Sequence, residues 1–336
     1  MFEHLDHGNE FHPDDGLRRR VVDRARTMRR RRRGAILGLT AAPVVLALAL
    51  VVPVVRDATR VQRITVPGLG TTPAGAGPGS RDGATRILLV GSDAGLLGGD
   101  TIGGRNDAVV LVTLRPGERS LALTSIPRDL LVGDGRDVPV GKVSEIGRHL
   151  GQLVSAVAEI GGHPVDHVVR VEAAAFPGIA DALGGLRLRF DRPMRDRASG
   201  FSTDGGCETL NGDRLLAYVR SRHLEVRDPS TGRWVVDPSG DFGRQERQQE
   251  VLIAAAQRLR DVDVRALLDL LADRATVDDQ LDLSTALDLA REVDGLRSVE
   301  REVLQVEEVT TPGGGAALRL TGARPVVQPL AAAGAC

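Results

Sequence analysis

Residues 107–126, DAVVLVTLRPGERSLALTSI, contain the pattern that decides the fold. Two runs, 107–114 and 120–126, are rich in β-branched and apolar residues, and the turn-forming stretch PGE at 116–118 separates them. Short, continuous apolar runs bounded by turn residues are typical of buried strands. The stretch therefore predicts two buried strands joined by a hairpin, and RILLVG at 86–91 predicts another.

Helical and strand patterns alternate through the rest of the chain. Helices are predicted at 143–160, 173–183, 242–260, 263–274 and 283–295, and further strands at 166–172, 186–191 and 303–309. This alternation predicts an α/β fold in which a mixed central β-sheet is sandwiched by helices. The 336 residues and 42% hydrophobic content are sufficient for one such domain and additional segments.

The N-terminal part has the features of a membrane anchor. Ten arginines lie between Arg18 and Arg33, and residues 35–55 follow as 21 residues without a charge. At about 1.5 Å per residue such a helix crosses a bilayer, and the positive-inside rule places residues 1–34 in the cytoplasm. The sequence thus predicts a single-pass protein of the cell membrane with its remaining domain outside. A cleaved signal peptide is the alternative.

The segments after the predicted span differ in composition. Residues 56–84 include a Gly/Pro-rich stretch and are predicted to be a linker. A folded domain is predicted at 85–325 and a C-terminal tail at 326–336. Cys207 and Cys336 are the only cysteines, and both would lie on the oxidising side, where they could form a disulfide.

Acidic and basic residues cluster where predicted strands and helices begin or end. Asp241 opens the helix at 242–260, and Arg244 and Arg247 lie in its first turns, where the backbone favours an anion. The other candidates are Asp93, Arg105, Asp107, Arg128, Asp129, Arg220, Arg222 and the only lysine, Lys142. An excess of arginine predicts a ligand with several phosphate oxygens, and the carboxylates of Asp93 and Asp107 predict a Mg²⁺ site. Ordinary capping and surface ion pairing would also explain any one of these groups.

Other classes of function are disfavoured. A net charge of -1 and 2% aromatic residues argue against nucleic acid as a partner. The sequence has no Gly-x-Ser-x-Gly motif, cysteine-based dyad or zinc signature.

Eight segments together resemble the LytR-CpsA-Psr family of cell-wall glycopolymer ligases. In chain order they are ILLVGSD, GRNDAVVLV, LTSIPRDLLV, GK at 141–142, FPGIADALGGL, DRPMRD, CETLNGDRLLAYVRSRH and GDFGRQERQQ. The resemblance covers residues 86–257. It departs at Asn106, where the family usually has a small residue, and at 143–151, VSEIGRHLG, which lacks the family's Asn, Ala and Tyr pattern.

The resemblance implies a phosphotransferase that moves a glycopolymer from a polyprenyl-pyrophosphate carrier to peptidoglycan through a phosphodiester bond. It implies Mg²⁺ on Asp93 and Asp107, which also serve as acid/base carboxylates, and a hydrophobic pocket for the polyprenyl chain. It assigns the catalytic roles to Asp93, Asp107, Arg128 and Arg244, and pyrophosphate binding to Arg105, Lys142, Arg220, Arg222, Arg247, Asp129 and Asp241. A lipid pyrophosphate hydrolase and a non-catalytic wall-binding or regulatory protein stay open as alternatives.

Overall fold

The computed structural model describes most of the chain after residue 61. The described residues are 62–73, 82–93, 96–98, 100–104, 106–133, 140–258, 274–282, 284–285, 288–289, 298–311, 313–322 and 325–329. The predicted cytoplasmic tail at 1–34 and the predicted membrane helix at 35–55 lie outside them. Within these ranges, no helix combines the length and apolar character that a membrane span requires.

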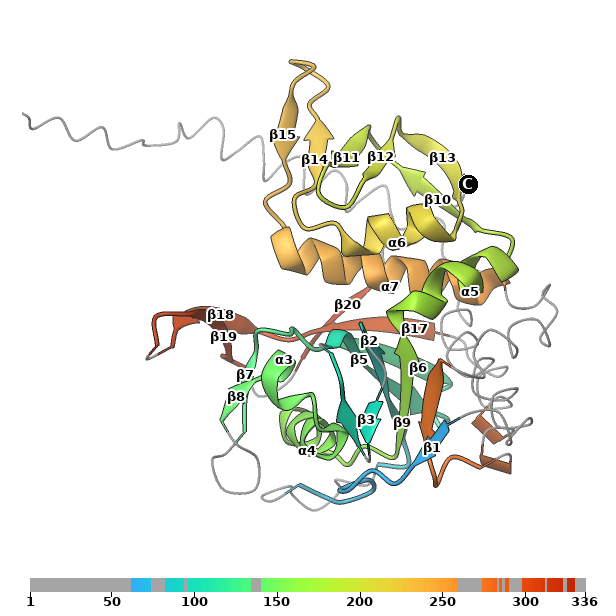
Figure 1. Cartoon of the computed structure of the whole chain (residues 1–336), viewed down its shortest axis with the longest axis vertical. Coiled ribbons are helices and arrows are strands. Elements are labelled where there is room, and N and C mark those ends of the chain that lie inside the picture. The colour runs from blue at the N-terminus through green and yellow to red at the C-terminus, as the bar shows by residue number, and fades with distance from the viewer. Residues whose placement is uncertain are drawn as a thin grey trace, which may run out of the picture. The chain divides into compact units, whose positions relative to one another are not determined.

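A mixed eight-stranded sheet forms the centre of the fold, as the sequence predicts (Figure 1). Its order is β1-β16-β9-β2-β5-β6-β17-β20. The strands are β1 (Gln62–Ile64), β2 (Thr85–Ser92), β5 (Asn106–Arg115), β6 (Ser120–Ser125), β9 (His167–Glu172), β16 (Ala275–Asp278), β17 (Ser298–Val303) and β20 (Val326–Pro329). The predicted hairpin is confirmed, because β5 and β6 pair antiparallel with Leu114 opposite Leu121. The pairs β2–β9 and β6–β17 are parallel.

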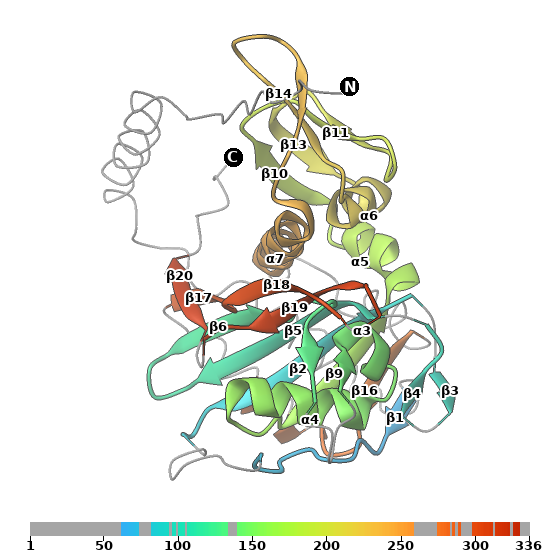
Figure 2. The ribbon, with the colours of Figure 1, turned by 90° about the vertical axis from the view of Figure 1, so that its left-hand side faces the viewer.

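The two faces of this sheet carry separate cores. Successive side chains of a strand point to opposite faces, and accordingly Ile87 and Leu88 are both fully buried but belong to different clusters. Helix α4 (Leu150–Gly161) covers the Leu88 face. Helices α5 (Phe176–Ala182), α6 (Gly212–Arg220) and α7 (Gly240–Arg258) contribute to the Ile87 face (Figure 2). Burial on both faces explains why the central strands appear in the sequence as continuous apolar runs.

Small sheets lie outside the central one. Beyond α6 are the pair β10 (Leu186–Phe190) and β13 (Gly206–Leu210) and a four-stranded sheet in the order β12-β11-β14-β15 (Figure 1). The latter comprises β12 (Phe201–Thr203), β11 (Met194–Asp196), β14 (Glu225–Arg227) and β15 (Trp234–Val236). The remaining elements are β3 (Leu96–Gly98), β4 (Thr101–Ile102), β7 (Leu131–Val132), β8 (Gly141–Lys142), α3 (Val143–Ile146), η1 (Ala173–Ala175), β18 (Val306–Thr310) and β19 (Ala316–Leu320).

The folded domain extends beyond its predicted bounds at both ends. Strand β1 lies in the predicted linker 56–84 and pairs with β16, and β20 lies in the predicted tail 326–336 and pairs with β17. Both are short strands at the two edges of the sheet. Short edge strands take much of their stability from the neighbouring strand rather than from their own residues. The amino-acid composition of these two segments therefore does not predict strands.

Two predicted elements are divided. The helix predicted at 143–160 forms as α3 and α4, with Gly147 ending α3. The strand predicted at 303–309 spans the end of β17 and most of β18. All but the last residue of the helix predicted at 263–274, and most of the helix predicted at 283–295, lie outside the described residues.

Candidate anion-binding active site

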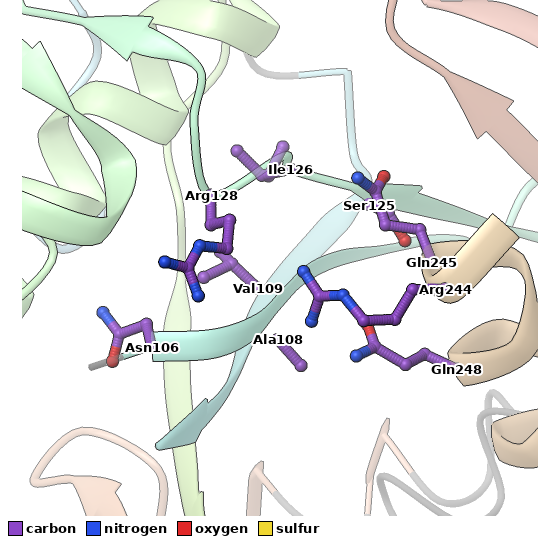
Figure 3. Close-up of a pocket in the computed structure, with 9 residues that line it drawn as sticks. All are labelled: Asn106, Ala108, Val109, Ser125, Ile126, Arg128, Arg244, Gln245 and Gln248. Carbon is purple, nitrogen blue, oxygen red and sulfur yellow. The ribbon is translucent and has the colours of Figure 1, made fainter. Parts of the chain in front are cut away.

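A small pocket lies where the N-terminal turns of α7 meet the strands β5 and β6. Arg128, which follows β6, lines one side together with Asn106, and Arg244 of α7 lines the other (Figure 3). The remaining lining residues are Ala108, Val109, Ser125, Ile126, Gln245 and Gln248. The structure therefore brings together two arginines that are 116 residues apart in the sequence.

The side chains around the pocket determine what it can bind. Its lining, among the described residues, holds two guanidinium groups and no carboxylate. The side chains of Gln245 and Gln248 add amide N–H donors. This chemistry suits a small anion with several oxygen atoms.

The loop that carries Arg128 is held by its backbone. The N–H of Ser144 in α3 donates to the Arg128 carbonyl at 2.9 Å, and the N–H of Val143 donates to Leu130 at 2.9 Å. The N–H of Leu318 in β19 donates to the Asp129 carbonyl at 2.9 Å. The carbonyls of three consecutive residues thus accept hydrogen bonds from α3 and β19. These bonds fix the backbone from which the Arg128 side chain extends.

Asp129 lies between two cations. Its carboxylate is 3.2 Å from Lys142 Nζ and 3.8 Å from Arg128 Nε. The Asp129 side chain is 42% exposed, so solvent screens these ion pairs and their contribution to stability is modest. Their effect on the site is to orient Arg128 and to bring the predicted Lys142 close to it.

Arg247 has different surroundings from Arg244, although the sequence predicts both on one helix face. Its Nη2 donates to the carbonyl of Ser221, the residue that caps α6, and its guanidinium lies 5.9 Å from the Tyr218 ring centroid. Burial lowers the pKa of the Arg247 guanidinium, and the interaction with Tyr218 opposes this. Arg247 therefore connects α7 to the end of α6.

The two predicted arginines of α6 and its following loop are exposed at the surface. Arg220 is the last residue of α6, and Arg222 follows the cap. The loop is held by buried Asp196, whose carboxylate accepts the N–H groups of Arg222 and His223, both at 2.9 Å. Burial would raise the pKa of Asp196, but these and two other backbone N–H donors outweigh it and lower the pKa.

The predicted magnesium carboxylates lie at the end of the β2–β5 pair. The strand register passes from Gly91 opposite Ala108 to Ser92 opposite Asn106, so Asp107 is the extra residue of a β-bulge. Asp93 follows directly after β2 and is exposed. Bulges redirect side chains and are frequent beside active sites.

The donor chemistry fits Mg²⁺, which takes one or two carboxylates with substrate phosphates and water. Within the described residues no group of three or more His, Cys, Asp or Glu side chains could hold a metal by itself. The side chains of Asp107 and Asp241, and all of Arg105, lie outside the described part of the chain.

The hydrophobic pocket that is expected for the polyprenyl chain stays a prediction, and the aromatic residues near α6 pack into the core. Phe190, Phe201 and Tyr218 pack on one another with ring centroids 4.8–5.8 Å apart, and both phenylalanines are 2% exposed. They form part of the core on the α7 side of the sheet. Cys207 in β13 is disulfide-bonded, and Cys336 lies outside the described residues.

Comparison with protein families identifies the family of the chain. Residues 60–321 match the model of the LytR_cpsA_psr family, which is most of the 336-residue chain. The chain belongs to the LytR-CpsA-Psr family. Its match begins before β2 and ends after β19, and so it includes both arginines of the pocket.

Curated members of the LytR-CpsA-Psr family share part of the sequence. The polyisoprenyl-teichoic acid–peptidoglycan teichoic acid transferase TagU of Halalkalibacterium halodurans is 30% identical over 203 residues, 58% of this chain and 61% of that protein. The Bacillus cereus protein of the same name is 32% identical over 182 residues, 53% of this chain and 54% of that protein. The matches thus span less than two thirds of either relative.

Solved structures share the fold. The LytR-Csp2A-Psr enzyme from Actinomyces oris aligns with a TM-score of 0.59 and 23% identity over 80% of this chain and 99% of that chain. The structure described as TagT bound to LI-WTA aligns with a TM-score of 0.57 and 23% identity over 77% of this chain and 93% of that chain.

The sequence does not predict several lining residues of the pocket. Gln248 is four residues after Arg244 and hence on the same face of α7, so the helical period could have identified it. Gln245 and Ser125 carry no comparable signal. Asn106 was recognised only as a departure from the family pattern, and its role in the pocket wall depends on the β5 register.

Proposed function

We propose that the chain is a Mg²⁺-dependent phosphotransferase that attaches a glycopolymer from a polyprenyl-pyrophosphate carrier to peptidoglycan. The observation that carries this proposal is the convergence of Arg128 and Arg244 on one pocket without a carboxylate in its described lining. Family membership and the names of the TagU relatives support the substrate class.

The proposed reaction is a displacement at phosphorus. A peptidoglycan hydroxyl oxygen bonds to the phosphorus that bears the glycopolymer, and the bond from this phosphorus to the bridging oxygen breaks. Polyprenyl phosphate leaves with the electron pair, and the hydroxyl proton passes to a carboxylate, for which Asp93 and Asp107 are the candidates. Such transfer depends mainly on positioning and on neutralising the phosphate charge. Arg128 and Arg244 would do both through forked N–H donors.

Asp93 and Asp107 are also the residues that would hold Mg²⁺. The ion would neutralise charge on the diphosphate oxygens when bound. Lys142 would add a cation at the edge of the pocket. Its ion pair with Asp129, the neighbour of Arg128, would hold the Lys142 ammonium group near Arg128. Arg105, Arg220, Arg222 and Asp241 complete the proposed set of pyrophosphate-binding residues. Arg247, whose Nη2 donates to the Ser221 carbonyl, supports this set by holding α7 against the end of α6.

A single membrane helix at 35–55, with residues 1–34 in the cytoplasm and the domain outside, completes the proposal. The uncharged 21-residue run and the preceding arginines support it. Cells expressing the full chain can be fractionated and the membranes washed at alkaline pH. The anchored form stays in the pellet, and release into the supernatant would contradict the anchor.

The activity is tested with the full chain in detergent, a synthetic polyprenyl-pyrophosphate-linked sugar, Mg²⁺ and a peptidoglycan oligomer. Product in which sugar phosphate is joined to the oligomer supports the ligase. Free sugar phosphate alone would instead identify a hydrolase, and an absence of turnover would favour a binding protein. Omitting Mg²⁺, with chelator present, should abolish turnover if the ion is required.

A further inference from the structure

Strand β15 is an exposed edge of the outer four-stranded sheet. It follows β14 in the order β12-β11-β14-β15, and no further strand pairs with it in the part of the chain that the structure describes (Figure 1). Val235 and Val236 of this strand are apolar and yet 52% and 60% exposed. An edge of this kind presents unpaired backbone groups and apolar side chains to which another strand can add.

The free backbone groups of β15 belong to Trp234 and Val236. In an antiparallel pair, opposite residues alternate between those that exchange backbone hydrogen bonds and those that do not. The N–H of Asp237 donates to the carbonyl of Leu224, which lies just before β14, at 2.7 Å. Residues 233, 235 and 237 therefore direct their backbone groups at β14, and residues 234 and 236 direct theirs outward. The outer edge offers two N–H donors and two carbonyl acceptors.

The sequence around β15 complements its own reverse. Residues 233–237 are RWVVD. When two copies run antiparallel with Val235 opposite Val235, Arg233 lies opposite the partner's Asp237. Trp234 then lies opposite the partner's Val236. Pairs of opposite charge and pairs of an aromatic with a β-branched residue both stabilise neighbouring strands.

The backbone agrees with the same register. Trp234 and Val236, whose backbone groups point outward, lie opposite each other in it. Each of the two Trp234–Val236 pairs can exchange two hydrogen bonds. Val235 becomes a pair without hydrogen bonds, and side chains are closest in such pairs. One register therefore satisfies the backbone, the charges and the apolar side chains together.

The side chains of this edge are placed for such a contact. Arg233 is exposed. Asp237 is half-buried, and its Oδ1 accepts the N–H of Ser239 at 2.9 Å; a carboxylate can accept from other donors at its second oxygen. The guanidinium of Arg195 lies 4.2 Å from the ring centroid of Trp234, which orders the indole before a partner binds.

Pro238 limits how far the pairing extends. It follows Asp237 and has no backbone N–H to donate to a further strand. A contact about a two-fold axis uses the same edge of both copies and leaves neither edge open. The pairing is thus confined to β15 and closes as a dimer.

We propose that β15 is a dimerisation edge at which two copies of the chain pair antiparallel about a two-fold axis through Val235. This inference does not rest on the proposed function. Two strands of three residues each bury less than the roughly 1,200–2,000 Å² of a stable interface, so the dimer is weak and reversible. Residues 237–239 join β15 to α7, so the contact adjoins the helix that carries Arg244.

Disulfide trapping of the full chain, in cells that express it, tests the register. Opposite residues of a pair without hydrogen bonds have Cα atoms about 4.5 Å apart, a separation that a disulfide can bridge. Mild oxidation of Val235→Cys should therefore give a covalent dimer on a non-reducing gel, and reductant should remove it. We expect this band to be at least ten-fold stronger than that of the unmodified chain under the same oxidation.

Val236→Cys is the matched control. In the proposed register its two introduced thiols are offset by two residues, about 7 Å along the strands, and this offset prevents a bridge. Arg189→Cys measures bridging by random collision, because Arg189 is 53% exposed and lies on β10.

Charge reversal tests the pairing by a second route. Arg233→Asp gives an edge with two acidic side chains, and Asp237→Arg gives one with two basic side chains. Either variant alone places like charges opposite each other, so sedimentation of the full chain in detergent should show dimerisation weakened roughly ten-fold. An equimolar mixture of the two variants should restore the dimer, because unlike edges then meet. Circular dichroism checks that both variants are folded, and disulfide trapping decides the question if either is not.

The outcomes that would overturn the inference are distinct. Bridging of Val235→Cys no stronger than that of Arg189→Cys would exclude the contact. Bridging of Val236→Cys as strong as that of Val235→Cys would exclude the register. A covalent product of Val235→Cys with a different protein, in place of the dimer, would show that the edge takes a foreign strand. None of these results changes the transfer assay, which tests the phosphotransferase by itself.

Discussion

Arg244 and Arg247 lie three residues apart on α7, both are buried, and they have different partners. Arg244 lines the pocket opposite Arg128, whereas Arg247 donates to the Ser221 carbonyl and lies against Tyr218. Three residues along a helix leave side chains about 60° apart around its axis. That difference is enough for one arginine to face β5 and β6 and the other to face α6. A motif with regular spacing can therefore combine a ligand-binding group with a structural one.

The strongest test of this comparison is removal of the pocket arginines. We expect Arg128→Ala and Arg244→Ala each to lower turnover of the polyprenyl-pyrophosphate donor by about 100-fold or more, because each removes a charged donor from the diphosphate. Circular dichroism should show that both variants stay folded. Arg189→Ala is the control, because Arg189 is 53% exposed and lies on β10, outside the pocket. Near wild-type turnover in both pocket variants would refute their assignment.

Arg247→Ala should affect stability more than either pocket variant. It leaves the Ser221 carbonyl without its charged donor, and such bonds contribute about 1.5–3 kcal/mol. In a domain of this size the melting temperature should fall by roughly 5–10 °C. Thermal denaturation of the full chain and of Arg244→Ala side by side gives the comparison. An unchanged melting temperature together with lost turnover would place Arg247 in the pocket chemistry instead.

Asp196 should make the stability of the α6 loop depend on pH. Its pKa is lowered from the ordinary value of 3.8, so on acidification the unfolded state takes up the proton first. The stabilisation is present above pH 3.8 and is lost as pH falls through the lower folded-state value.

Asp196→Asn tests this dependence. At neutral pH it should cost about 1–2 kcal/mol, because a neutral amide accepts the backbone N–H groups less well than a carboxylate does. The difference in unfolding free energy between wild type and variant should shrink with acidification below pH 3.8. Urea titrations at several pH values measure it, and a difference that does not depend on pH would contradict the assignment.

Arg222→Ala should have the smallest effect. Arg222 is exposed, and exposed charges are screened by salt. We expect a less than ten-fold rise in the KM for the donor and little change in kcat. The rise in KM should diminish as salt is added. A loss as large as that of Arg128→Ala, insensitive to salt, would indicate that the α6 loop closes onto the pocket.

The sequence predicted the four middle strands of the central sheet, β9, β2, β5 and β6, but few of the peripheral strands. The stretches 86–91, 107–114 and 120–126 form β2, β5 and β6, since strands buried on both faces need apolar residues at every position. Strands such as β11, β12, β14 and β15 have three residues each. Their formation depends on partners far away in the sequence, and three residues are too few to show a period.

The candidate site was predicted in its residue types and only partly in its geometry. The sequence predicts Arg128 and Arg244 as site residues because each charge lies near the end of a predicted strand or helix. In the structure both line the pocket. Arg247 was named for the same reason and lies against α6. The sequence marks Asn106 only as a departure from the family pattern, and its place in the pocket wall follows from the register of β5.

The sequence by itself determined the fold class, the family and the set of charged groups, because burial patterns and motif order are properties of local residues. Only the tertiary structure decided which charges meet. The crossing of α7 over β5 and β6 brings Arg244 to Arg128, and the bulge at Asp107 with the break at Gly147 orients Asn106. These contacts depend on strand register and helix packing between distant segments, and no stretch of sequence specifies them alone.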